Sequence, residues 1–505
     1  LKLKKILDLI FKMDLKKSID IFLILIVSIL SIILVKVAFF NLENFQFAAD
    51  IFRHFSSIRN IFDGAGPYEG PVMEFTFGTH TYFIFYLIAP FLFFLKDPKI
   101  LILINILSVS LSVPLIYFIS KKLLSKLDKY NLISLLVSLS YMFFPTLFKG
   151  YFYQPYGFQA DTIATPLFLI LFYIFLLKKF NSFLFLSIII LSIKEEFILI
   201  YPALIILIFW IAKLFNLNGL ELNKAKIIII SFIYLISSAV IVISLYYFSQ
   251  LNNFNYIPPF WENNSFDTNY FKLIMIKFLK IIFPLIPIIL ILGFYSKNDK
   301  KIIIGIFFIF LAAILRVLEN IIIYATPNGS AWGNLILAPI FFIILIVLSK
   351  RYFEIKSAPK TPFYIGIFLI ILLSLTNNYF AVPSIKTSIK FYLNHEENIN
   401  FKKELELVDD KIIKYKKNDY IILPEYLNYP FINKMSYVSY HYFDNNIKSF
   451  EDKKKIIQDA SYILIFKKNE MEFFRYLNLP SNNLIQLVNK HKIKILETKN
   501  ILLFR

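Results

Sequence analysis

A few acidic, basic and imidazole side chains in this sequence have a spacing that could support chemistry. Asp50 and His54 are four residues apart, so a helix would place both side chains on one face. There the carboxylate could accept a proton or orient the imidazole, as a general base does when it activates a hydroxyl. The competing interpretation is structural, because an aspartate can also cap the helix that follows it. The pattern marks Asp50 as a candidate catalytic base and His54 as a candidate substrate contact.

Three further side chains stand next to apolar runs. Glu74 and His80 flank a short segment directly before such a run and could line the mouth of an external cavity, although a histidine there can also serve structure alone. Asp161 opens another apolar run, where it could bind substrate or cap a helix. The aromatic segment 151–158 before it could anchor in the membrane interface or stack on sugars. We treat Glu74, His80 and Asp161 as candidate substrate contacts.

Lys194, Glu195 and Glu196 interrupt an otherwise apolar stretch. Three adjacent charges cannot all face lipid without a large energetic penalty, so they must face a cavity or one another. A lysine is a compact cation that suits a phosphate or pyrophosphate. An internal ion pair that stabilises a break between two helices is the alternative, and both interpretations stay open.

The elements that hold these side chains are expected to be membrane helices. Hydrophobic residues make up 58% of the chain and charged residues only 17%, and the mean hydropathy is +0.65, all outside the range of soluble domains. Several apolar runs approach or reach the roughly 20 residues that a helix needs to cross a bilayer. These runs include Ile21–Phe40, Leu101–Ser120, Ile227–Phe248, Leu273–Phe294 and Ile302–Tyr324.

Lysine and arginine predict the orientation, because they collect in cytoplasmic loops. The lysine-rich N-terminus is expected inside, which makes 41–99 the first outer loop. The run Thr81–Leu95 has only fifteen residues and contains Pro90, so we expect a re-entrant or interfacial helix there. The later basic loops then all fall inside, provided that Phe183–Trp210 breaks near Lys194 into two crossings. These loops lie at 121–129, 178–179, 213–226, 297–301 and 350–360.

The tail becomes charged from Val382 onward, which predicts a transmembrane domain at 1–381 and a soluble extracytoplasmic domain at 382–505. An amphipathic helix is expected at Phe401–Lys417, between or beside short strands, in a small α/β fold. The last two strands are expected to form a hairpin around Thr498-Lys499-Asn500. The expected strands are Tyr420–Leu423, Tyr462–Phe466, Ile493–Leu496 and Ile501–Phe504.

Several classes of protein are disfavoured by what the sequence lacks. It has no cysteine, no Walker loop, no His-Glu-x-x-His motif and no Gly-x-Ser-x-Gly motif. It also has no tandem Asp-x-Asp in the outer loops, so no strong metal site is indicated and the need for a divalent metal stays open. The net charge of +20 indicates solvated loops and retention at anionic lipid headgroups, not binding of nucleic acid.

Three motifs resemble those of a known family. They are Phe77-Gly78-Thr79-His80, the run Tyr156–Asp161 that opens a span, and Ile193-Lys194-Glu195-Glu196, which looks like the family's Val-Lys-Glu-Asp. The chain thus resembles a family of polytopic membrane proteins catalogued as a domain of unknown function and related to the GT-C membrane glycosyltransferase superfamily.

The resemblance implies a GT-C-like bundle with a large first outer loop, a re-entrant or interfacial helix that does not cross, and a small extracytoplasmic α/β domain at the C-terminus. The apolar runs and the charged loops together predict about eleven transmembrane helices. It also implies transfer of a sugar from a polyprenyl-phosphate donor, with an acid in the first outer loop as base. By position this acid is Asp50. The sequence departs from the family pattern at Ala48, where the family tends to carry the acid, and at Gln159, where a histidine is usual.

The resulting hypothesis is a glycosyltransferase of the cytoplasmic membrane that works on the extracytoplasmic face, with its N-terminus in the cytoplasm. Lys194 would lie near the donor phosphate, while the acceptor, whether glycan, lipid or protein, stays open. Two alternatives remain. One is a non-catalytic protein of the same fold that binds or transports lipid-linked glycans, and the other is a secondary transporter, which would require inverted repeats with paired broken helices. The remaining candidate substrate contacts are His54, Glu74, His80, Asp161, Glu195 and Glu196.

Overall fold

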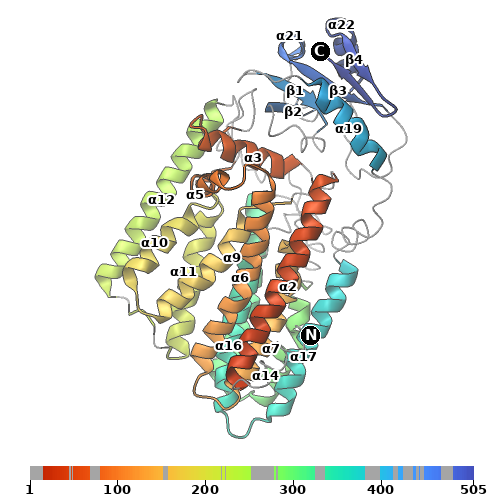
Figure 1. The fold of residues 1–505 in the computed structure, drawn as a ribbon. Coiled ribbons are helices and arrows are strands. Elements are labelled where there is room, and N and C mark those ends of the chain that lie inside the picture. Colours follow the sequence, from red (N-terminus) through yellow and green to blue (C-terminus); the bar gives the residue numbers. More distant parts are fainter. Residues whose placement is uncertain are drawn as a thin grey trace, which may run out of the picture.

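The computed structural model of the chain is a bundle of helices with a small β-sheet near one end (Figure 1). It describes residues 15–44, 47, 49–68, 80–151, 157–217, 219–221, 223–251, 278–279, 282–324, 336–381, 399–412, 419–424, 436–439, 443, 449–467 and 481–505.

The bundle is built from apolar helices, the structure that satisfies every backbone hydrogen bond within one segment in lipid. Three described helices are long and apolar enough to cross a membrane alone: α2 (Leu15–Glu43, from Ser18), α6 (Lys99–Leu124) and α12 (Lys224–Leu251). The others are α7 (Tyr130–Met142), α8 (Pro145–Gly150), α9 (Asp161–Leu176), α10 (Phe180–Leu191), α11 (Phe197–Leu214), η3 (Phe283–Leu285), α14 (Ile286–Tyr295), α15 (Lys300–Tyr324), α16 (Leu337–Glu354) and α17 (Lys360–Ala381). The span expected at Leu273–Phe294 lies partly outside the described residues, and its second half forms η3 and α14.

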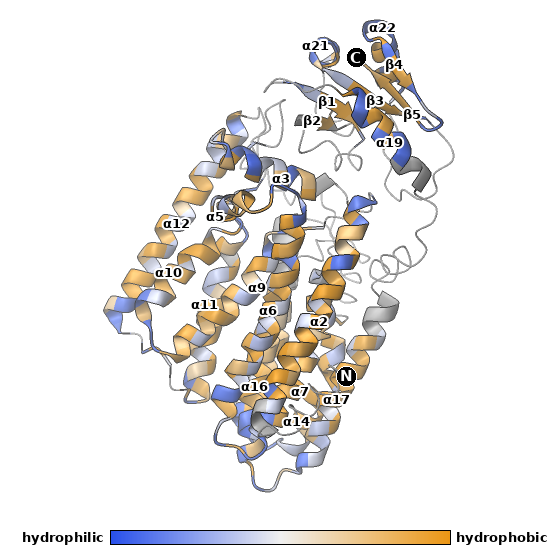
Figure 2. Cartoon of the chain, viewed as in Figure 1, coloured by the Kyte–Doolittle hydropathy of each residue, from blue (hydrophilic) through white to orange (hydrophobic). Residues whose placement is uncertain are grey.

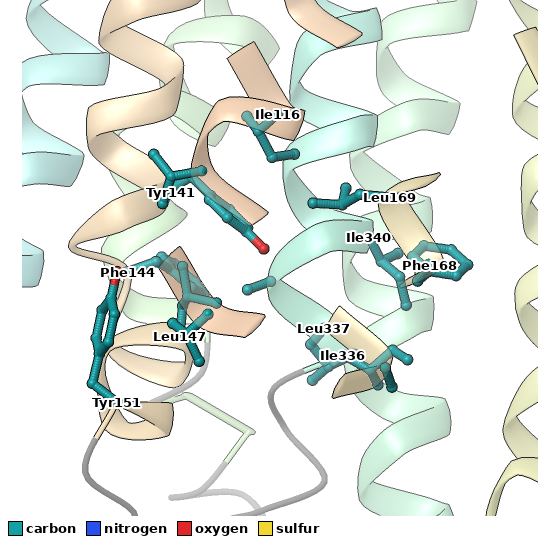
Figure 3. Close-up of a cluster of buried hydrophobic side chains, with 14 of the residues drawn as sticks. Ile116, Tyr141, Phe144, Leu147, Tyr151, Phe168, Leu169, Ile336, Leu337 and Ile340 are labelled. Atoms are coloured by element: carbon teal, nitrogen blue, oxygen red, sulfur yellow. The ribbon is translucent and has the colours of Figure 1, made fainter. Parts of the chain in front are cut away.

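Two helices show the extremes of packing in the bundle. Every residue of α16 from Leu337 to Ser349 is buried, as expected for a helix that is apolar all round and lies in the core. The rings of Phe341 and Phe342 pack edge to face against Tyr141 and Phe144. Figure 3 shows Tyr141 and Phe144 among other buried hydrophobic side chains of the bundle. By contrast, α12 lies at the edge of the bundle and is exposed along most of its length (Figure 1), so it is suited to a lipid environment.

The run expected not to cross forms α5 (Ile84–Ile88) and η1 (Ala89–Phe93), five residues each, which confirms a short helix there. Helix α3 (Ala49–Phe62) packs against both and lies across the end of the bundle (Figure 1). Its apolar side chains Ile51, Phe52, Phe55 and Ile58 are fully buried. We call α3, α5 and η1 the cap, because together they cover one end of the bundle.

The expected break near Lys194 is also confirmed. Helix α10 ends at Leu191 and α11 begins at Phe197, and five residues join them. We call residues 192–196 the break.

The tail contains a five-stranded sheet in the order β2-β1-β3-β5-β4. The strands β2 (Ser436–Ser439), β1 (Tyr420–Leu423) and β3 (Tyr462–Phe466) are parallel, whereas β5 (Ile501–Phe504) and β4 (Lys494–Glu497) form an antiparallel hairpin beside β3. Helix α19 (Ile399–Lys411) covers one face, and α21 (Phe450–Asp459) and α22 (Asn482–His491) cover the other.

Most of the expected tail elements are present. The four expected strands and the final hairpin are confirmed, with β4 one residue later than expected. One expectation was wrong, and one strand was missed. The helix expected to reach Lys417 ends at Lys411, and a strand that the sequence did not predict, β2, pairs at the edge of the sheet. Helix α17 ends at Ala381, and the proposed domain boundary at Val382 lies outside the described residues.

The two ends of the bundle differ in character. The loops α6–α7, α9–α10, α11–α12, α14–α15 and α16–α17 all lie at the end away from the sheet, where Figure 2 shows hydrophilic segments. We call this the basic end, because these loops carry the lysine clusters noted in the sequence, and the opposite end the sheet end.

Candidate functional site

At the sheet end, the segment before α5 is bound to the break. The Ile84 N–H donates to the Ser192 carbonyl at 2.8 Å, and the Thr81 N–H donates to Glu195 Oε2 at 3.0 Å. His80 Nδ1 lies 2.7 Å from Glu195 Oε1. Glu195 therefore joins two segments that are more than 110 residues apart in the sequence.

The chemistry of Glu195 fixes the state of the His80 ring. Burial alone would raise the pKa of this carboxyl, but the charge and hydrogen bond of His80, together with Lys194, lower the pKa to about 2. An ionised carboxylate only accepts hydrogen bonds, so Nδ1 of His80 must donate. In the neutral ring the lone pair then lies on Nε2.

The other two charges of the break form an ion pair. Lys194 Nζ lies 2.5 Å from Glu196 Oε1, and the two side chains are only 6% and 1% exposed. Burial would lower the pKa of Lys194, but chiefly Glu196 holds it well above its usual value, so the pair is ionised. Asp161, the first residue of α9, is buried close enough to contribute to the field at Lys194. Of the two interpretations of the lysine, the structure contains the internal ion pair.

His54, on α3, is surrounded by aromatic rings. Its ring meets Tyr82, Phe85 and Phe158 edge-on at centroid distances of 5.1, 5.3 and 5.8 Å. Neither ring nitrogen has a hydrogen-bond partner among the described residues. Burial, and then the charges of His80, Arg53 and Lys194, lower the pKa of His54 to about 3, so the ring is neutral.

An unpaired buried imidazole is costly, by about 1–3 kcal/mol for a buried polar group. Such groups are rare in native structures and point to a partner that completes the site, such as a water, an ion or a substrate. His54 therefore brings unused hydrogen-bonding capacity close to the charges of the break.

The structure brings six of the eight candidate residues together at the sheet end, from four separate segments of the chain: His54, His80, Asp161, Lys194, Glu195 and Glu196. We call these six the polar cluster. Asp50 lies on α3 one turn before His54, but its side chain is not described, and Glu74 lies outside the described residues.

Two contributors were missed in the sequence. Thr81 supplies a backbone donor to Glu195, and Tyr82 packs against both histidine rings. Their position directly after His80 was the available signal. Among the described residues, no group of three or more histidine, aspartate or glutamate side chains could hold a metal ion.

The sequence matches the family described as "Predicted membrane protein (DUF2079)" over residues 51–327, which is more than half of the chain. The chain belongs to this family. The match includes the cap from Ile51 onward, the break and every member of the polar cluster. No curated protein matches the sequence significantly.

Solved structures show the fold. The chain is similar to ArnT from Cupriavidus metallidurans bound to undecaprenyl phosphate, with a TM-score of 0.52 and 9% identity over 94% of this chain and 97% of that one. For ArnT from the same organism in the apo state the TM-score is 0.47, with 7% identity over 95% and 97%. The chain therefore shares its overall fold with ArnT. The expected family of membrane proteins is confirmed by the family match. The protein is an integral membrane protein.

Proposed function

We propose that the protein is a membrane glycosyltransferase that moves a sugar from a polyprenyl-phosphate donor to an acceptor hydroxyl. The observation that carries the proposal is the buried polar cluster at the sheet end, in a fold shared with a solved protein that was crystallised with undecaprenyl phosphate. Charged side chains buried at the end of a membrane bundle are costly, so a function that needs them is the simplest reason for them.

The donor phosphate would sit next to the break. Lys194 carries a positive charge, and a phosphate oxygen would accept a hydrogen bond from its ammonium group beside Glu196. The one N–H of the neutral His54 ring would donate to another phosphate oxygen, and Asp161 would orient the sugar. Direct attack by the acceptor hydroxyl, as the phosphate leaves, would invert the anomeric carbon. The role of Asp50 as base rests on the family resemblance alone, because its side chain is not described.

The proposed orientation puts the polar cluster and the sheet outside the cytoplasm. It is supported by the loops of the basic end, because lysine and arginine favour the cytoplasmic side. The N-terminus would then be cytoplasmic, and residues 382–505 would form an extracytoplasmic domain over the site, suited to hold an acceptor. The membrane is the cytoplasmic membrane.

One observation favours a second candidate, a non-catalytic protein that binds or transports lipid-linked glycans. The charge of Lys194 is already balanced by Glu196, and five of the six cluster side chains are largely buried. Such a site could hold a lipid-linked sugar without activating it. The same assay separates the two candidates.

The test is sugar transfer from a panel of polyprenyl-phosphate sugars by the full chain in nanodiscs. We expect transfer by the wild type, strong loss in Lys194→Ala, and normal transfer in the control Lys122→Ala at the basic end. Asp50→Asn tests whether Asp50 is the base that the family resemblance implies. Thermal unfolding of each variant separates loss of chemistry from loss of folding. Binding of lipid-linked sugar without transfer across the panel would favour the second candidate, and transport of an unmodified solute would favour a secondary transporter.

A further inference from the structure

His80 is the most accessible member of the polar cluster. Its side chain is 37% exposed, whereas that of its partner Glu195 is 11% exposed and the remaining four residues are buried. A molecule that approaches the cluster from outside the bundle therefore meets the His80 ring first.

The orientation of the His80 ring is fixed by two independent anchors. Glu195 Oε1 holds Nδ1 at 2.7 Å, while Glu195 Oε2 accepts from the Thr81 N–H at 3.0 Å. The ring also packs against Tyr82 at a centroid distance of 5.4 Å. Because the carboxylate is itself tied to the backbone beside the histidine, the ring has little freedom to turn.

This arrangement has the parts of an activated base. In nucleophilic and acid–base sites, a carboxylate that accepts from one imidazole nitrogen leaves the other with a lone pair and stabilises the imidazolium that forms. Here Nδ1 is bound to Glu195, so Nε2 is the nitrogen left to accept a proton.

We propose that His80, positioned by Glu195, accepts the proton of the acceptor hydroxyl in the reaction. The inference rests on the proposed function and names His80, in place of Asp50, as its proton acceptor. The hydroxyl oxygen forms a bond to the anomeric carbon as the bond from that carbon to the phosphate oxygen breaks. The bonding electrons stay on the polyprenyl phosphate, the hydroxyl proton moves to His80 Nε2, and the imidazolium later releases it to water.

His54 is less suited to this role. It is fully enclosed, and the pKa of its ring is lowered to about 3 by burial and by the charges of His80, Arg53 and Lys194. A base works best when its pKa lies near the working pH. His54 is therefore better placed to donate or accept a fixed hydrogen bond than to take up a proton.

A tautomer measurement tests the geometry without any activity. The chain has only five histidines, so selective ¹⁵N labelling and single substitutions can assign their resonances. In wild-type protein in nanodiscs, neutral His80 is expected to carry its proton on Nδ1, and Glu195→Gln is expected to shift the population toward Nε2–H. An Nε2–H tautomer in the wild type would overturn the proposal.

The kinetic test uses a substitution that keeps the anchor and removes the base. In His80→Asn the amide NH₂ can replace Nδ1 as donor to Glu195, but nothing replaces Nε2. The expected result is a fall in kcat of about 10²–10⁴-fold with a small change in KM, with an unfolding temperature close to that of the wild type. Glu195→Gln is expected to lower kcat as well, because the carboxylate that fixes the ring and stabilises the imidazolium is lost.

Glu404→Gln is the matched control. Its carboxylate also accepts from a backbone N–H and a side chain, those of Asn500, but this contact joins α19 to the turn between β4 and β5. The substitution should leave kcat unchanged. If the wild type transfers sugar and His80→Asn keeps its kcat within threefold, the proposal is overturned while the proposed function stands. If the wild type binds lipid-linked sugars but transfers none, the proposed function fails and this proposal with it.

Discussion

The two ends of the bundle both contain ion pairs, but one pair at each end differs sharply from the other in its exposure to water. At the basic end, Lys121 Nζ lies 2.8 Å from Asp20 Oδ1, and the Tyr117 hydroxyl donates to the same carboxylate. Those lysine and aspartate side chains are 23% and 33% exposed, whereas the Lys194–Glu196 pair at the sheet end is almost fully enclosed. The Lys121–Asp20 pair is thus partly solvated, while the Lys194–Glu196 pair is removed from water, in a cluster that also contains the unpaired ring of His54.

This contrast separates structural from functional ion pairs. A buried pair is weak evidence for stability, because the cost of desolvation can exceed the gain from attraction. The pair at the basic end needs no role beyond joining α2 to α6. The pair at the sheet end, in a cluster with unused hydrogen-bonding groups, is better explained by a ligand.

The largest expected effect comes from removing one partner of each pair. Lys194→Met leaves Glu196 buried without its partner and should lower the free energy of unfolding by about 3–5 kcal/mol. Lys121→Met leaves Asp20 partly solvated and should cost about 1 kcal/mol or less. Denaturant unfolding in detergent measures both.

The double variant Lys194→Met, Glu196→Leu is the control, because it removes both charges at similar volume. It should recover most of the stability lost in Lys194→Met. If Lys194→Met and Lys121→Met lowered the free energy of unfolding equally, the contrast between the two ion pairs would be contradicted.

A smaller effect is expected at His54, and it depends on pH. The folded pKa is about 3 against 6.5 for a free ring, so the unfolded chain binds the proton more tightly. The contribution to stability is complete above about pH 6.5 and is lost as the pH falls toward 3, by roughly 2 kcal/mol between pH 7.5 and 5.

His54→Phe keeps the aromatic surround and removes this titration. Its unfolding temperature should therefore fall less between pH 7.5 and 5 than that of the wild type. Parallel pH dependence in the two proteins would show that His54 is not buried in a neutral state. In the transfer assay the variant should lose activity, because the phenyl ring has no nitrogen for the substrate.

The smallest effect concerns the packing of α3 at the sheet end. Gly157 has φ +71°, and a Cβ there would come within 3.1 Å of Ile51 and Phe47. Gly64 has a similar φ of +76°, but a Cβ there would meet nothing within 4 Å. Alanine at Gly64 should cost only backbone strain, about 1 kcal/mol, and alanine at Gly157 about 1 kcal/mol more. Equal unfolding temperatures for the two variants would mean that the loop does not pack on α3.

The sequence predicted the bundle, the short helix and the break because each depends on a local property. Fifteen residues are too few to cross, and three adjacent charges cannot stay in lipid. The strand β2 was missed because Ser436–Ser439 has little apolar signal and is defined by its pairing with β1. The end of α19 was placed too late because an amphipathic pattern does not by itself mark where a helix stops.

The site was predictable as a set of residues but not as a set of partners. The cost of burying charge pointed to Lys194, Glu195 and Glu196, yet the choice of Glu196 for Lys194 and of His80 for Glu195 depends on how the cap folds onto the break. The isolation of His54 likewise depends on side chains from three other parts of the chain. Such contacts leave no pattern in a single sequence.

The most direct test is an experimental structure of the full chain in nanodiscs with bound polyprenyl phosphate. The account predicts phosphate density at the sheet end, within hydrogen-bond distance of Lys194 and beside His54 and His80. Phosphate bound instead at the basic end, near Lys121 and Lys122, would contradict it.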